Sequence, residues 1–220
     1  SVGVMAVYLP EVLNLGPELF ALTLAVVGGI PSHEPLWRWA GMLHALGVEA
    51  ADGVGVRLKF SNQHRELVGS YVERVGVFDL GVMPSRVFCR RLMVELRENL
   101  PGFLALVDAR AQAHGGALNV RVQASLYVLR EHAQALLADF GDWDGLTPTL
   151  PTGLGLALID QAGYPRSPDL RKVMDWLREQ VLLERLPNPP TEAQCVQAAL
   201  YKRQHLSGDQ DLPAGWDVAM

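Results

Sequence analysis

The chain has 220 residues, with 19 Lys/Arg against 24 Asp/Glu, a formal net charge of −5 and a hydrophobic content of 49%. These values are typical of a folded globular protein and exclude an intrinsically disordered chain. A chain of this length can bury a sizeable core, in one large domain or in two small ones. Two isolated cysteines do not make a disulfide framework, which favours an intracellular protein, in the cytoplasm of a bacterium or of a host cell.

The N-terminal region predicts one short strand followed by helices. Val2–Leu9 is rich in Val and Tyr, which favours a strand. A proline suits the first turn of a helix over residues 17–27. The stretch without charge or proline, residues 19–30, is only twelve residues long, so we expect a buried helix and no transmembrane segment. Ser32 would cap a further helix over residues 33–46.

Residues 53–60 carry the clearest strand pattern of the chain. Val54, Val56, Leu58 and Phe60 would point to one side, and Arg57 and Lys59 to the other. Val48–Ala50 would be its hairpin partner, across a turn at Asp52-Gly53. Further short strands are expected at 75–80 and 118–122.

Capping residues and prolines predict helices over most of the remaining chain. Ser61 or Asn62 would cap the first of these helices. Thr191 with Gln194 forms a capping box, and Ser167 precedes a proline and an acidic residue. The helices are expected at residues 62–74, 84–98, 101–115, 125–140, 167–186 and 191–205. The predicted fold class is therefore mainly α, or α+β with a few short strands, in a compact helical domain.

Glycine and proline concentrate in residues 141–155, which we interpret as a loop or a domain boundary. The expected organisation is a core over 1–140 with a basic middle segment, this loop, a C-terminal helical part over 156–205 and a mobile tail over 206–220. Charge follows the same division, because residues 1–130 have a net charge of +1 and residues 131–220 a net charge of −6.

An arginine-rich stretch between residues 57 and 97 is the most informative feature, with eight Lys/Arg against four Asp/Glu. Arginine forms paired hydrogen bonds with phosphate, so the stretch predicts a surface that binds an anion such as a single-stranded nucleic acid. The candidate binding residues are Arg57, Lys59, Arg65, Arg86, Arg90, Arg91 and Arg97. The alternative is that these arginines pair with nearby glutamates on a solvent-exposed face.

No residue of the chain is nominated as catalytic, and no cofactor or metal ligand is predicted. Cys89 lies beside arginines, which lower a thiol pKa, but no base accompanies it in the sequence, so both Cys89 and Cys195 are interpreted as buried structural residues. Asp142 and Asp144 form a short acidic pair of a kind that is common by chance. The six histidines show no metal-binding spacing.

We therefore expect a non-enzymatic protein that self-assembles or coats nucleic acid, of the viral or phage nucleocapsid, coat or matrix type. Its partners would be a single-stranded nucleic acid, further copies of the chain or another protein. A second hypothesis is a bacterial adaptor, effector or regulatory module that binds another protein. A third is a metal-dependent enzyme that uses Asp142, Asp144 and Cys89.

Overall fold

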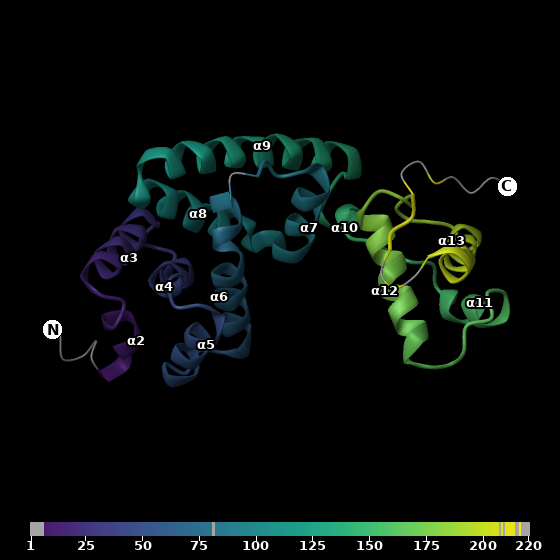
Figure 1. The fold of residues 1–220 in the computed structure, drawn as a ribbon, viewed down its shortest axis with the longest axis horizontal. Coiled ribbons are helices and arrows are strands. Elements are labelled where there is room, and N and C mark those ends of the chain that lie inside the picture. The colour runs from purple at the N-terminus through teal and green to yellow at the C-terminus, as the bar shows by residue number, and fades with distance from the viewer. Residues whose placement is uncertain (1–6, 81, 207, 209, 214–215, 217–220) are drawn as a thin grey trace. The chain divides into compact units, whose positions relative to one another are not determined.

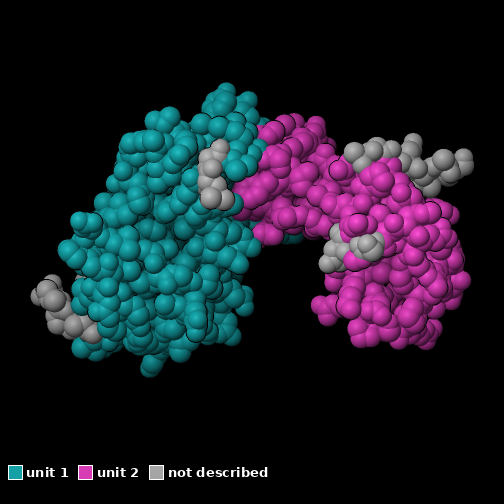
Figure 2. Space-filling view, viewed as in Figure 1, with its two compact units in different colours: residues 1–84, 96–131 teal, residues 85–95, 132–220 magenta. Residues whose placement is uncertain are grey.

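The computed structural model describes residues 7–80, 82–206, 208, 210–213 and 216 (Figure 1). The regular elements among these residues are α-helices and short 3-10 helices, so the mainly α fold class is confirmed. The chain forms two compact units (Figure 2). Unit 1 contains residues 1–84 and 96–131, and unit 2 contains residues 85–95 and 132–220.

Unit 1 is a bundle of helices whose core contains three aromatic rings. Its elements are α2 (Pro10–Leu13), α3 (Pro17–Gly29), α4 (Pro35–Leu43), α5 (Val48–Arg57), α6 (Asn62–Arg74), η1 (Val75–Leu80), η2 (Arg97–Asn99), α8 (Leu100–His114) and the first part of α9 (Gly116–Phe140). Helix α3 packs on α4 and α8, and α5 packs on α6. The ring centroid of Phe103 lies 5.7 Å from that of Tyr71 and 6.2 Å from that of Phe78, so α8 joins α6 and η1 in one core.

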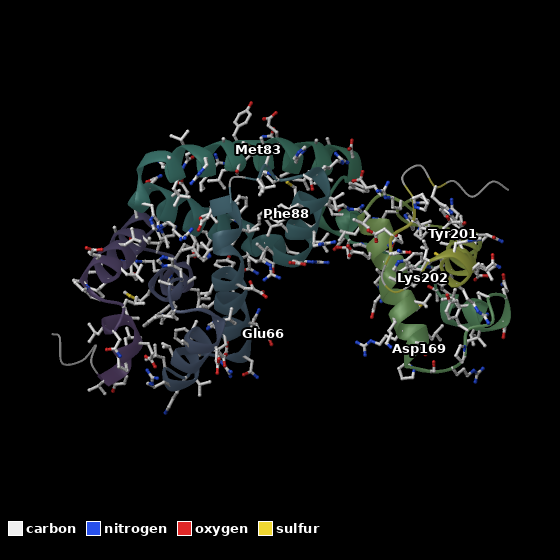
Figure 3. All side chains as sticks on the ribbon, viewed as in Figure 1. Glu66, Met83, Phe88, Asp169, Tyr201 and Lys202 are labelled. Atoms are coloured by element: carbon white, nitrogen blue, oxygen red, sulfur yellow. The ribbon has the colours of Figure 1, made fainter. Side chains whose placement is uncertain are left out.

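Unit 2 has a separate core. Its elements are most of α7 (Arg86–Leu96), the remainder of α9, α10 (Trp143–Leu146), α11 (Leu154–Asp160), α12 (Pro168–Leu182) and α13 (Glu192–His205). Leu158, Leu177 and Cys195 are fully buried at the contact of α11, α12 and α13. Lys202, next to Tyr201 on α13, has its Nζ 4.4 Å from the centroid of the Trp176 ring (Figure 3).

Part of the segment predicted as a mobile tail packs against unit 2. Leu212 is only 1% exposed, and its backbone N–H donates to the Gln180 side chain at 2.8 Å. The Gln180 amide in turn donates to Asp211 at 3.0 Å. The hydrogen bonds of one buried glutamine therefore attach this segment to α12.

The prediction of a strand at residues 53–60 with a hairpin partner at Val48–Ala50 is wrong. Residues 48–57 form helix α5, and residues 58–60 follow it. Helical spacing buries Ala51, Val54 and Gly55 on one face and leaves Val56 55% exposed, so the apparent alternation does not match two sheet faces. A Cβ atom at Gly55 would lie 2.9 Å from the Arg65 side chain, so this glycine permits the close packing of α5 on α6. That contact outweighs the strand propensity of the valines.

The other predicted strands are also absent from the described residues. Residues 75–80 form the 3-10 helix η1, in which Val75 and Phe78 are buried at a spacing of three. Residues 118–122 lie in α9. Of the strand predicted at Val2–Leu9, residues 1–6 lie outside the described part of the chain, and Val7 and Tyr8 are helical.

The local capping signals predicted helix starts well. Ser61 accepts a hydrogen bond from the backbone N–H of His64, and Ser167 accepts one from that of Asp169. The capping box at Thr191 is present. The helix expected from residue 33 instead begins at Pro35, after Glu34 rather than after a capping serine. A proline at the first position therefore sets this start without a side-chain cap.

We predict that the stability of unit 1 falls as the pH is lowered from about 7 to about 5.5. Burial lowers the pKa of His44 below its ordinary value of 6.5, by more than the hydrogen bond to the Gly41 carbonyl raises it. Nearby, burial also lowers the pKa of His114, while Arg110 disfavours and Asp79 favours protonation of both imidazoles. The two imidazoles bind protons less readily in the folded state than in the unfolded chain, so the free energy of unfolding decreases as the pH is lowered. The decrease is at most about 1.4 kcal/mol per pH unit for each histidine.

Urea unfolding at several pH values measures this slope. His44→Gln is expected to reduce it, whereas His33→Gln changes a side chain that is 79% exposed and serves as the matched control. Equal slopes for the wild type and His44→Gln would contradict the prediction.

Candidate functional site

The structure divides the seven candidate anion-binding residues between the two units. Arg57, Lys59, Arg65 and Arg97 belong to unit 1, and Arg86, Arg90 and Arg91 belong to unit 2. The basic stretch of the sequence is therefore not one continuous element. Each group is described within its own unit.

Two arginines of unit 1 form bidentate ion pairs with carboxylates. Arg57 at the end of α5 contacts Glu11 of α2 through N–O distances of 2.9 and 2.5 Å. Arg65 of α6 contacts Asp52 of α5 at 2.8 and 2.7 Å. Hydrogen bonding to these carboxylates raises the pKa of both guanidinium groups. Both arginines thus connect helices of unit 1.

Lys59 and Arg97 share an unusual backbone conformation. Lys59, in the turn after α5, has a φ of 58°, and Arg97, at the start of η2, has a φ of 46°. Both side chains are exposed. A positive φ is uncommon for residues other than glycine, and here it occurs just after the last residues of α5 and α7, where left-handed residues commonly end a helix.

Arg90 of α7 is fully buried, although the sequence indicates a surface role. Its Nε donates to the Leu146 carbonyl at 3.2 Å, and its Nη1 donates to the carbonyls of Val181 at 2.7 Å and Leu182 at 3.3 Å. Its Cζ lies 4.4 Å from the centroid of the Phe140 ring. Burial lowers the pKa of this guanidinium, and the charge of Glu184 opposes that effect. A guanidinium enclosed in this way cannot contact a nucleic acid in the folded protein.

The other two arginines of α7 form ion pairs within unit 2. Arg86 contacts Asp139 of α9 at 2.7 Å and Glu184, just beyond α12, at 3.1 Å. Partial burial would lower the pKa of Arg86, but these two hydrogen bonds outweigh it and raise the pKa. Arg91 contacts Glu179 of α12. The arginines of α7 therefore bind the acidic C-terminal part of the chain.

This arrangement removes the charge asymmetry of the linear sequence. Unit 1 contains nine Lys/Arg and eleven Asp/Glu, a net charge of −2. Unit 2 contains ten Lys/Arg and thirteen Asp/Glu, a net charge of −3. Residues 85–95 add three arginines and one glutamate to unit 2, which makes the two net charges more alike, and neither unit is basic.

Three further residues considered for chemistry, Asp142, Cys89 and Cys195, lie in unit 2. The Asp142 carboxylate accepts a hydrogen bond from the Gly145 backbone N–H at 2.8 Å and caps α10. Cys89 and Cys195 are buried free thiols, and burial raises their pKa to about 11 and about 12. Within the described part of the chain, no group of three or more His, Cys, Asp or Glu side chains is arranged to hold a metal ion.

The sequence interpretation missed an exposed face of α9. Val120 is 71% exposed and Tyr127 is 63% exposed, and a spacing of seven residues places them on the same side of the helix. Ala117 and Ala124 complete alternating steps of three and four residues. These four residues are called the α9 seam below. The spacing was visible in the sequence, but the strand predicted at 118–122 concealed it.

The opposite side of α9 fixes the helix in unit 1. Val122, Leu126 and Leu129 are buried there, at most 1% exposed. Beside them the Gln123 amide donates to Asp108 of α8 at 2.5 Å. Packing of this buried side therefore keeps the α9 seam on the exposed side of the helix.

Comparison with protein-family models, with curated proteins and with solved structures finds no match for this chain. No helix within the described residues is long and apolar enough to cross a membrane.

We predict that Arg90→Met destabilises unit 2 by about 2–5 kcal/mol. The substitution keeps apolar volume but removes the Arg90 donor from the buried carbonyls of Leu146 and Leu182. Arg90→Lys is expected to be destabilising too, because one ammonium cannot reproduce the planar fork of the guanidinium. Urea unfolding followed by tryptophan fluorescence measures the change, and hydrogen exchange of peptides from residues 140–186 locates it.

Arg171→Met on α12 is the matched control, because that side chain is 89% exposed. Its effect should stay within about 0.5 kcal/mol. If the Arg90→Met and Arg171→Met variants have the same stability, the structural role that we assign to Arg90 is contradicted.

We also predict that neither cysteine reacts with a thiol reagent in the folded protein at neutral pH. Cys89 and Cys195 are both 0% exposed, and their raised pKa keeps them in the thiol form. Both should react after unfolding in concentrated guanidinium. Rapid labelling of Cys89 in the folded state would instead support a nucleophilic role.

Proposed function

We propose that the protein is a non-enzymatic assembly component, which associates with other protein subunits through the α9 seam. One observation carries this proposal: Val120 and Tyr127 stand exposed at a seven-residue spacing on a helix whose opposite face is buried. Large apolar side chains grouped on one face of a rigid helix are typical of an interaction surface.

The composition of the seam supports contact with another helix. Alternating steps of three and four residues form the pattern that packs two helices knobs-into-holes. The seam itself carries no charge, so its burial leaves no unpaired ion. Complete burial of a valine side chain stabilises an interface by roughly 1.5–3 kcal/mol, before the entropic cost of association is subtracted.

The contacts of the arginines favour assembly over nucleic-acid coating as the leading proposal. Of the seven candidates, Arg57, Arg65, Arg86, Arg90 and Arg91 donate to carboxylates or carbonyls of their own unit. A phosphate group would have to displace these partners. Binding of a single-stranded nucleic acid stays a prediction, which fluorescence polarisation at two salt concentrations can test.

We predict that the wild-type protein associates with increasing concentration and that Val120→Glu combined with Tyr127→Glu shifts it toward the monomer. The two carboxylates would have to be buried without partners in the interface. Size-exclusion chromatography with light scattering and sedimentation velocity measure the mass directly.

Val56→Glu on α5 is the matched control, because Val56 is 55% exposed in the same unit but outside the seam. It should associate like the wild type, and circular dichroism should show equal helix content in all variants. A wild type that stays monomeric at high concentration, or a seam variant that associates normally, would contradict the proposal.

A further inference from the structure

We propose that the occupant of the α9 seam is the α9 seam of a second copy of this chain, packed antiparallel about a two-fold axis at the level of Val122. The inference rests on the proposed function and specifies the partner and its orientation. In this arrangement Ala117 faces Tyr127 of the second copy, and Val120 faces Ala124.

The sizes of the four side chains are self-complementary in this register. The midpoint between residues 117 and 127 and the midpoint between residues 120 and 124 both fall at residue 122. One two-fold axis therefore places an alanine opposite each large side chain, at all four positions. Alternation of large and small residues fills the space between two helices without voids.

A parallel, in-register pair would match the same residues less well. Tyr127 would face Tyr127 and Val120 would face Val120, while alanine would face alanine at the other two positions. The large pairs would hold the helices apart and leave cavities between the alanines, which are destabilising. Antiparallel packing also brings opposite ends of the helix dipoles together.

Disulfide cross-linking of seam variants that each carry one added cysteine tests the orientation. In the antiparallel pair, the two copies of residue 117 are ten residues apart along the axis, about 15 Å at a rise of 1.5 Å per residue, which is too far for a disulfide. Residue 117 of one copy instead faces residue 127 of the other. A mixture of Ala117→Cys and Tyr127→Cys should form a disulfide-linked dimer under oxidation, whereas neither variant alone should.

The native Cys89 and Cys195 are buried, so the wild type under the same oxidation is the control and should remain uncross-linked. Cross-linking of each variant alone would overturn the antiparallel orientation and leave the proposed function standing. Association of the wild type without any cross-link would show that another surface is used. A strictly monomeric wild type would contradict the proposed function itself.

A side-chain exchange tests the register without removing Tyr127. Ala124→Val alone places valine against Val120 of the second copy, and this overpacking should weaken association roughly tenfold or more. Adding Val120→Ala restores one large and one small residue at the same contact, so the double variant should recover association close to that of the wild type. Failure of the second substitution to rescue the first would overturn the register.

Discussion

The guanidinium of Arg90 is the interaction on which unit 2 depends, because it gathers the ends of three helices. Leu146 is the last residue of α10, Val181 and Leu182 end α12, and Phe140 ends α9. The last carbonyls of a helix have no partner within the helix, and a positive charge near them is favourable. A single buried cation thus satisfies acceptors that would otherwise require water, and it fixes how these helix ends meet.

This arrangement explains why α7 folds with the C-terminal region although unit 1 surrounds it in the sequence. Arg90 anchors the helix from inside, while Arg86 and Arg91 contact Asp139, Glu184 and Glu179 at its edges. The positive charges of the sequence and the negative charges of its C-terminal part therefore meet within one unit. A local excess of arginine indicates a nucleic-acid surface only when its partners are not supplied by the same chain.

The elements that sequence could predict are those fixed by neighbouring residues. Ser61, Ser167 and Thr191 cap helices through hydrogen bonds that span two or three residues. The contacts that sequence could not predict join distant segments, such as Arg91 with Glu179, which is 88 residues away. The strand predicted at 53–60 failed for the same reason, because packing on α6, rather than the local pattern, decides which valines of α5 are buried.

The sequence pattern indicates the arginines as the binding surface, whereas our proposal places that surface on α9. Arginines that resemble a binding surface are used inside unit 2, whereas Val120 and Tyr127, within a segment partly interpreted as a strand, remain exposed. The buried side of α9 holds the exposed side rigid, so ordering the seam costs little additional conformational entropy on association. A rigid face with paired large and small residues matches its own inverted copy better than an arbitrary helix, and this match is the reason for proposing a symmetric association.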